Sequence, residues 1–311
     1  MLETQDLTKH FKEVKAVDSI NLFIERGEIV GLLGPNGAGK TTAIAMIAAL
    51  IPPTRGEVLL YGKSVIASPA PLRQILGMVP QQLALYPDLT ARENLQFFGR
   101  LYGLKGKSLA VRVDEVLELV GLEAKAHRPV STLSGGMQRR LNIGLALLHE
   151  PRFVIMDEPT VGIDPQSRHH ILETVRRLNR EKGMTVLYTS HYMEEAEQLC
   201  DRVAIMDRGE IIALDTPAGL IRGLESDSVV EFTAESEAEA AFHRLPGVKE
   251  VRRTGERQTG VVLLTDRLQE TLSGLITWAG ERGVVLKDLR TRTATLEDVF
   301  LQRTGKRLTQ E

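Results

Sequence analysis

The sequence predicts an α/β protein with a parallel core sheet over residues 1–223 and a small α+β domain over residues 224–311. Three observations support this fold class. Before residue 223, short apolar runs alternate with longer helical patterns, as in βαβ units. A glycine-rich segment joins one apolar run to a helical pattern, and the pattern changes again beyond residue 223. The 311 residues, 42% hydrophobic and 26% charged, leave room for one large and one small domain.

The elements expected in the larger domain follow from these runs. Short β-like segments and turns come first and indicate an N-terminal β subdomain. Four apolar runs predict buried strands at residues 28–33, 153–156, 185–188 and 203–206. Between residues 90 and 130 the pattern becomes helical and is punctuated by glycines, which predicts a helical insertion. We expect the whole helical subdomain to span about residues 83–150.

The smaller domain has a different order of elements. Strand-like segments at 229–232, 248–253, 260–265 and 284–289 are interspersed with helical patterns at 236–245 and 267–281, and a short helix at 296–302 closes the domain. The order β-α-β-β-α-β is that of the ferredoxin-like arrangement. We expect the boundary between the two domains near Gly223.

Charge, apolar runs and cysteine content exclude several classes of protein. The net charge of −2 provides no basic field that would attract nucleic acid, so no nucleic-acid partner is expected. The longest apolar run, Ala43–Ile51, is far shorter than the roughly 20 residues that cross a bilayer. The opening residues lack the pattern of a signal segment. The lone Cys200 rules out an internal disulfide and fits a reducing compartment. These features predict a cytosolic protein whose membrane role, if it has one, is peripheral.

The first glycine-rich segment follows the run at 28–33. It reads Gly34-Pro35-Asn36-Gly37-Ala38-Gly39-Lys40-Thr41-Thr42 and fully matches G-x-x-x-x-G-K-[ST]. Its glycines let successive backbone N–H groups face phosphates, and the helix N-terminus that follows adds partial positive charge. Lys40 is placed to reach the β- and γ-phosphates of a nucleotide, and the Thr41 hydroxyl to ligate Mg²⁺. The alternative is a glycine-rich turn that only closes the strand.

Two adjacent carboxylates end the run at 153–156. Ligands bind at the carboxyl ends of parallel strands, so Asp157 is expected beside the phosphate loop, holding Mg²⁺ directly or through water. Glu158 is then placed to polarise the attacking water as general base. Alternatively, the pair caps the next turn, helped by Pro159.

A second glycine-rich segment opens a predicted helix. It reads Leu133-Ser134-Gly135-Gly136-Met137-Gln138. Serine is a favoured N-cap, so simple helix capping is one interpretation. Capping does not explain two glycines in the first turn, which cost about 1 kcal/mol each relative to alanine. Bare backbone donors beside an anion would explain them. Because one nucleotide needs only one such loop, this surplus anion site suggests that the chain completes the active site of a partner.

Over roughly residues 1–220 the chain resembles the ATP-binding-cassette (ABC) family, because the segment 133–138 matches the signature motif of that family. The resemblance implies ATP as ligand and ATP hydrolysis as activity, with Ser134, Gly135, Gly136 and Gln138 among the nucleotide-binding residues. Gln81 matches the glutamine loop, which senses Mg²⁺ and the attacking water and touches the membrane subunit; Gln82 is a weaker candidate. His191 matches the switch histidine that contacts the γ-phosphate. Without the resemblance, His191 would be interpreted as an exposed loop residue.

Two further positions follow from the resemblance. Asp164 ends the segment at the place of the D-loop, where Val161 departs from the usual Ser or Ala and leaves the geometry of the loop open. Phe11 lies where the family has an aromatic that stacks on adenine, a contact that does not distinguish ATP from GTP. The alternative for Phe11 is an ordinary core side chain in an N-terminal strand.

Within the family, the chain is similar to the drug-resistance and multidrug-efflux branch of ATP-binding subunits. Residues 295–301 match the terminal motif of that branch, although by pattern alone they are a capping threonine and an amphipathic turn. The stretch 86–95 is also typical. The resemblance implies two copies that close head to tail around ATP and Mg²⁺. It also implies a separate integral-membrane permease, a peripheral position on the cytoplasmic face of the membrane, and a drug, antibiotic or lipid-like cargo.

A different class of function is a soluble cassette ATPase of translation or DNA repair. Such proteins usually carry two cassettes or a long coiled-coil insertion, whereas this chain has one cassette and no sustained heptads. The segment 224–311 has no evident metal cluster or catalytic constellation. For that segment, a role in dimer contacts or subunit regulation is favoured over binding of a small ligand.

Overall fold

The computed structural model describes residues 1–224, 226, 228–234, 239–254 and 259–304. The chain divides into two compact units, Met1–Leu214 and Asp215–Glu311. The division falls before the expected boundary at Gly223 because α8 (Pro217–Arg222) packs against α11 (Leu296–Thr304) within the second unit. Among the described residues, no helix has both the length and the apolar character needed to cross a bilayer.

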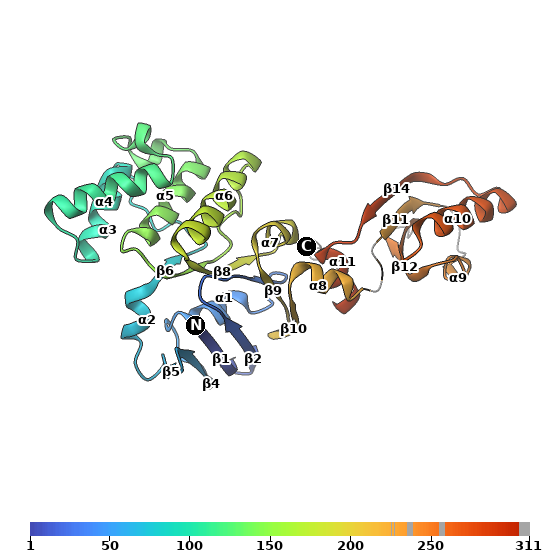
Figure 1. Cartoon of the computed structure of the whole chain (residues 1–311), viewed down its shortest axis with the longest axis horizontal. Coiled ribbons are helices and arrows are strands. Elements are labelled where there is room, and N and C mark those ends of the chain that lie inside the picture. Colours follow the sequence, from blue (N-terminus) through green and yellow to red (C-terminus); the bar gives the residue numbers. More distant parts are fainter. Residues whose placement is uncertain (225, 227, 235–238, 255–258, 305–311) are drawn as a thin grey trace. The chain divides into compact units, whose positions relative to one another are not determined.

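The first unit contains most of the helices and strands (Figure 1). Its strands are β1 (Leu2–Phe11), β2 (Val14–Ile24), β3 (Ile29–Leu33), β4 (Arg55–Leu60), β5 (Lys63–Ser64), β6 (Leu76–Val79), β7 (Phe153–Met156), β8 (Thr185–Ser190), β9 (Arg202–Asp207) and β10 (Glu210–Asp215), which reaches the unit boundary. Its helices are α1 (Lys40–Ile47), α2 (Ala70–Ile75), α3 (Ala91–Leu101), α4 (Gly106–Leu119), α5 (Gly135–Leu147), α6 (Pro165–Lys182) and α7 (Met193–Leu199), with 3-10 turns at Glu123–Lys125 and Val130–Thr132.

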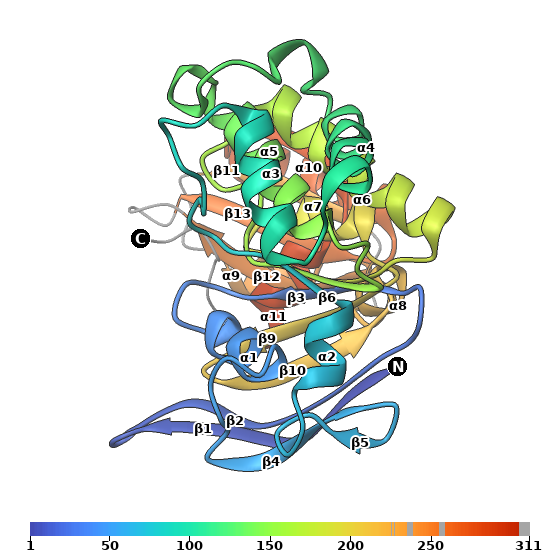
Figure 2. The ribbon, with the colours of Figure 1, turned by 90° about the vertical axis from the view of Figure 1, so that its left-hand side faces the viewer.

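Two sheets form the framework of this unit. The N-terminal strands make an antiparallel sheet in the order β2-β1-β4-β5. The second sheet has the order β10-β9-β3-β8-β7-β6, and its strands from β9 to β6 are parallel. The predicted parallel core sheet is therefore confirmed, and β6 extends it at one edge. Figure 2 shows the N-terminal sheet at the bottom and α3, α4 and α5 at the top.

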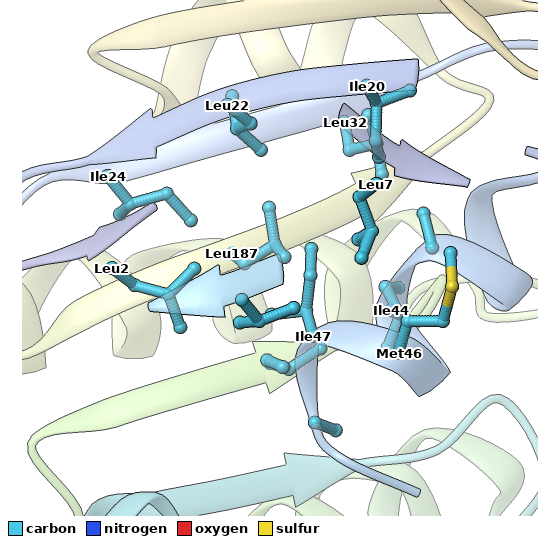
Figure 3. Close-up of a cluster of buried hydrophobic side chains, with 14 of the residues drawn as sticks. Leu2, Leu7, Ile20, Leu22, Ile24, Leu32, Ile44, Met46, Ile47 and Leu187 are labelled. Atoms are coloured by element: carbon cyan, nitrogen blue, oxygen red, sulfur yellow. The ribbon is translucent and has the colours of Figure 1, made fainter. Parts of the chain in front are cut away.

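The main hydrophobic core lies between the two sheets, around α1. Leu2, Leu7 and Leu22 of the N-terminal strands face Ile44 and Ile47 of this helix (Figure 3). Core strands β3, β7 and β8 contribute buried side chains to the same cluster. The apolar run at 43–51, too short for a membrane span, is thus largely a buried helix, as its position after the phosphate loop predicts.

The helical insertion has a small core of its own. Side chains of α3, α4 and α5, including Leu95, Val113 and Leu141, form a separate buried cluster. Helix α3 begins with a capping box, in which Thr90 Oγ1 accepts from the Glu93 backbone N–H and the Glu93 carboxylate accepts from the Thr90 backbone N–H. The expected helical insertion is present.

The second unit has ferredoxin-like topology. Its further elements are β11 (Ser228–Thr233), α9 (Glu239–Phe242), β12 (Val248–Thr254), β13 (Gly260–Thr265), α10 (Leu268–Arg282) and β14 (Lys287–Thr293). The sheet order is β12-β13-β11-β14 with antiparallel neighbours throughout. The expected order of elements is confirmed. The helix predicted at 236–245 is seen as α9, and its residues 236–238 lie outside the described residues.

The last strand of this sheet begins later than the sequence predicts. The apolar residues Val284 and Leu286 pack against the core of the unit, and β14 starts only at Lys287. Every residue of β14 is exposed, so the strand carries no apolar pattern that could reveal it. The prediction of a strand at 284–289 was therefore displaced toward the N-terminus.

A buried carboxylate fastens α11 to this sheet. Asp298 is 1% exposed and accepts hydrogen bonds from Arg292 Nη1 at 2.6 Å, Arg292 Nη2 at 3.0 Å and the Thr295 backbone N–H at 2.9 Å. Burial acts to raise the pKa of Asp298, but the bonds from Arg292 and Thr295 outweigh burial and hold this pKa below its ordinary value. The segment 295–301 is thus more than a capping threonine and an amphipathic turn.

The substitution Asp298→Asn is expected to destabilise the second unit by about 1–3 kcal/mol, because it removes a charged acceptor and leaves buried donors poorly paired. The only tryptophan of the chain, Trp278, lies in this unit, so its fluorescence during denaturation reports on the unit alone. Because the folded pKa of Asp298 is depressed, the difference from wild type should shrink as pH falls below about 3.9, the ordinary carboxyl value.

Glu297→Gln is the control for this experiment, because Glu297 is an exposed acid on the same helix. A stability difference between wild type and Asp298→Asn that persisted unchanged at low pH would contradict the ion-pair explanation.

Candidate ATP-binding site

The parallel sheet brings four predicted segments to one edge. Strands β3, β8, β7 and β6 are parallel neighbours, so their carboxyl ends point the same way. Strand β3 leads into the loop 34–39, and β8 leads to His191. Strand β7 leads into the pair Asp157 and Glu158, and β6 leads to Gln81. Although β8 lies between β3 and β7, the side chains of the phosphate loop and of Glu158 still meet.

The phosphate loop has a conformation that only glycine allows at two positions. Gly39 has φ +103°, and a Cβ there would lie 2.3 Å from the Ala16 carbonyl oxygen. A Cβ at Gly34 would lie 2.2 Å from the carbonyl oxygen of Met206. The loop therefore rests directly on neighbouring backbone. Helix α1 begins at its end, so the N–H groups of its first turn face the space above the loop.

Three predicted catalytic side chains converge on the carboxylate of a fourth, Glu158. Glu158 Oε1 lies 3.1 Å from Lys40 Nζ. Gln81 Nε2 donates to Glu158 Oε2 at 3.2 Å, and His191 Nδ1 lies 3.3 Å from the same oxygen. Lys40 and Glu158 are only 5% and 6% exposed. Lys40 Nζ also donates to the carbonyl oxygens of Gly34 and Pro35, so the ammonium lies at the base of the loop.

The backbone of Glu158 is held in an uncommon conformation. Its φ is +45°, a left-handed value that costs about 1–2 kcal/mol in a residue other than glycine. Thr189 Oγ1 accepts from the Glu158 backbone N–H at 2.9 Å and donates to Asp157 Oδ1 at 2.9 Å. One threonine of β8 thus fixes the Asp157 carboxylate and the Glu158 backbone.

Asp157 and Thr41 have the oxygen donors that suit Mg²⁺. The Asp157 carboxylate is buried, and the Thr41 hydroxyl lies near enough to lower the pKa of Asp157. Burial raises the pKa of Asp157, while the bonds from Thr189 and Thr41 oppose the rise. Within the described ranges, no group of three or more His, Cys, Asp or Glu side chains could hold a metal ion by itself. A hard cation held by one carboxylate, one hydroxyl and phosphate oxygens fits this donor set.

The signature segment opens α5. Ser134 Oγ accepts from the Met137 backbone N–H and caps α5, whereas a Cβ at Gly135 would meet nothing within 4 Å. A Cβ at Gly136 would lie 2.1 Å from Ser167 Oγ and 3.3 Å from Asp164 Oδ2. Among the described residues, no hydrogen bond or ion pair joins residues 134–136 to residues 34–39.

Three other predicted residues take clear positions. Gln138 Nε2 donates to the Val130 and Leu133 carbonyl oxygens, so its amide supports the signature segment. The exposed Asp164 caps α6 by accepting from the Ser167 backbone N–H at 2.9 Å. Phe11 is 49% exposed at the end of β1, with Lys9 Nζ 5.3 Å from its ring centre. Phe11 is therefore not a core residue, and a face of its ring is open to a ligand.

The sequence did not single out two residues that shape the site. Thr189 looks like an ordinary strand former, because threonine in an apolar run is common. Arg139 is buried and donates to the Pro80 and Gln81 carbonyl oxygens, at 2.9 Å and 2.6 Å, which fixes the glutamine loop. A charged residue among the apolar positions of α5 signals a buried polar contact, but nothing in the sequence indicates the partner of Arg139.

Comparison with known proteins identifies related families and proteins. The family model described as "ABC transporter" matches residues 17–161, and the model "ABC transporter domain-containing protein-like, C-terminal domain" matches residues 229–295. The linearmycin resistance ATP-binding protein of Bacillus subtilis is 44% identical over 311 residues, covering 99% of both chains. Nod factor export ATP-binding protein I of Ralstonia nicotianae is 37% identical over 99% of this chain and 95% of its own.

Solved structures lead to the same family. A dimeric ATP-binding cassette in a post-hydrolysis state with ADP and Pi matches with a TM-score of 0.64 and 30% identity, covering 70% of this chain and 98% of its own. The ATP-binding subunit of an ABC transporter matches with a TM-score of 0.64 and 31% identity, covering 72% and 93%. These relatives do not favour a translation or DNA-repair ATPase. The chain belongs to the ABC transporter family, as an ATP-binding and ATP-hydrolysing subunit of its drug-resistance branch.

Proposed function

We propose that this subunit powers export of a drug, antibiotic or lipid-like compound through a separate integral-membrane permease, from the cytoplasmic face of the membrane. Two relatives that align over 99% of this chain support the proposal: one is named for linearmycin resistance and the other for Nod factor export. The observation that carries the mechanism is that, within the described part of the chain, no bond joins the loop 34–39 to residues 134–136.

Two copies close head to tail, so that each nucleotide lies between the loop 34–42 of one copy and the signature segment 134–138 of the other. The Gly135 and Gly136 backbone N–H groups then face the γ-phosphate that Lys40 contacts from the opposite side. Only ATP carries that phosphate, and a ligand favours closure only through contacts it makes in the closed state. ATP therefore closes the dimer, and hydrolysis releases it.

Hydrolysis depends on three side chains and on Glu158, which they surround. Its carboxylate orients the attacking water and accepts a proton from it, and Gln81 holds that carboxylate in place. His191 steadies the γ-phosphate, and Lys40 offsets negative charge on the β-γ bridging oxygen as the bond breaks. Thr41, Asp157 and Gln81 would hold Mg²⁺, which would supply further charge neutralisation. Phe11 stacks on the purine.

The permease is expected to dock on the helical insertion, residues 83–130, with Gln81 at its edge. Exposed apolar side chains gather in this part of the chain: Leu83, Tyr86, Phe97, Leu101 and Tyr102. The rings of Tyr86 and Phe97 lie 5.0 Å apart, edge to face. Exposed apolar groups of this kind are typical of protein interfaces.

The proposal is tested by solubilising native membranes in mild detergent, capturing the subunit and identifying the integral-membrane proteins that co-purify. Wild type is expected to retain one permease, and Phe97→Asp to lose most of it, because a charge is placed in an apolar interface. Ile276→Asp is the matched control, since Ile276 is an exposed apolar residue of the second unit. The transport proposal fails if wild type retains no membrane protein.

A further inference from the structure

A buried carboxylate outside the catalytic cluster joins four segments of the cassette. Glu195, on α7, is 3% exposed. Its Oε2 accepts hydrogen bonds from Thr160 Oγ1 at 2.9 Å, Tyr188 Oη at 2.8 Å and Ser190 Oγ at 2.9 Å. Its Oε1 lies 3.4 Å from Arg168 Nε. Three hydroxyl donors and one guanidinium on a single buried carboxylate make a network that loses geometry when any member is removed.

Glu195 holds the switch histidine from both sides. Ser190, which donates to Glu195, immediately precedes His191, and its Oγ also accepts from the Tyr192 backbone N–H at 2.9 Å. The Tyr192 ring lies 4.1 Å from the His191 ring, and Arg168 Cζ lies 4.5 Å from the centre of the Tyr192 ring. The residues before and after His191 therefore both reach Glu195, one directly and the other through Arg168.

The same carboxylate reaches the segment that supports the signature glycines. Thr160 follows Glu158 by two positions, and Arg168 donates its backbone N–H to the Asp164 carbonyl oxygen at 2.9 Å. Asp164 and Ser167 lie so close to Gly136 that no side chain fits there. A continuous series of contacts thus runs from His191 through Glu195 to the signature segment.

We propose that Glu195 is a positioning residue that holds His191 and the segment 160–168 in a fixed relation to each other. As a result, two sites move together: the γ-phosphate site of this chain, and the signature segment that this chain contributes to the site of its partner. This inference rests on the proposed head-to-tail dimer. Glu195 contacts neither Lys40 nor the loop 34–39 in any described bond, so its contribution concerns alignment and closure rather than initial ATP binding.

The substitution Glu195→Gln tests the proposal, because glutamine keeps the size of the side chain and removes the charge that faces Arg168. We expect kcat for ATP hydrolysis to fall roughly three- to thirtyfold, the usual range for loss of coupling between sites, while KM for ATP changes by less than about threefold. Glu194→Gln is the control: Glu194 is the adjacent, exposed acid of the same helix, and this variant should match wild type. A purely structural role would lower thermal stability without this split between kcat and KM.

A dimer assay separates failure of this inference from failure of the proposed function. In a Glu158→Gln background, light scattering measures the ATP concentration that half-saturates dimer formation. The inference predicts that adding Glu195→Gln raises this concentration at least threefold, whereas adding Glu194→Gln does not. If Glu158→Gln alone never dimerises, the head-to-tail function itself is wrong. If it dimerises and Glu195→Gln changes neither kcat nor the midpoint, the role of Glu195 is wrong.

Ser190→Ala decides the question if Glu195→Gln fails to fold, because it removes one donor and leaves the carboxylate in place. It is expected to lower kcat with little change in KM. A folded Ser190→Ala variant with wild-type kcat would overturn the inference.

Discussion

Replacing Glu158 with glutamine is expected to lower kcat for ATP hydrolysis roughly 10²–10⁴-fold, the usual contribution of a general base. Glutamine can still accept the hydrogen bond that Gln81 donates to Glu158 Oε2, although it loses the ion pair with Lys40. It cannot accept a proton from water. ATP binding should persist, because Lys40 and the loop 34–39 are unchanged.

This variant should also accumulate as an ATP-stabilised dimer, since hydrolysis no longer separates the copies. Steady-state phosphate release gives kcat, nucleotide titration gives affinity, and light scattering gives mass. Glu194→Gln serves as the charge-matched control, because Glu194 is an exposed acid. Two results would contradict the scheme: wild-type kcat in Glu158→Gln, or a variant that stays monomeric at saturating ATP.

The parts of the site that the sequence predicts are those whose chemistry is continuous along the chain. The loop 34–42 carries its whole phosphate-binding device in nine consecutive residues, and Asp157 and Glu158 follow directly from a buried strand. The pairing of parallel strands then brings the carboxyl ends of β3, β7 and β8 to the same edge of the sheet. Alternation of strands and helices therefore predicts both the fold and the edge at which these segments meet.

The parts that the sequence does not predict depend on partners far apart along the chain. Arg139 fixes Gln81 from 58 positions away, and Thr160 reaches Glu195 across 35 positions. A single sequence shows neither pairing. The bounds of β14 were misplaced for another reason: it is an exposed strand of charged residues, threonines and one leucine, and its register comes from pairing with β11. A periodic pattern of apolar residues reveals a strand only where one of its faces is buried, and no residue of β14 is buried.

The substitution Gly135→Asp is expected to abolish the ATP-dependent dimer while the single chain still folds and binds ATP. A Cβ at Gly135 meets nothing within 4 Å, so the chain itself has room for the side chain. An acidic residue in the first turn of α5 is also favourable to the helix dipole. In the closed dimer, however, the new carboxylate would face the γ-phosphate of the partner's ATP. Like charges placed together cost on the order of several kcal/mol, which corresponds to roughly 10²-fold or more in dimer affinity.

Gly280→Asp is the matched control, because Gly280 is a helical glycine of the second unit and a Cβ there also meets nothing within 4 Å. Light scattering of both variants, each combined with Glu158→Gln, compares their dimers at saturating ATP. We expect Gly280→Asp to dimerise like the parent and Gly135→Asp to stay monomeric with unchanged nucleotide affinity. If Gly135→Asp dimerised normally, the signature segment would not face the nucleotide, because no closed arrangement with a carboxylate against a triphosphate could keep wild-type affinity.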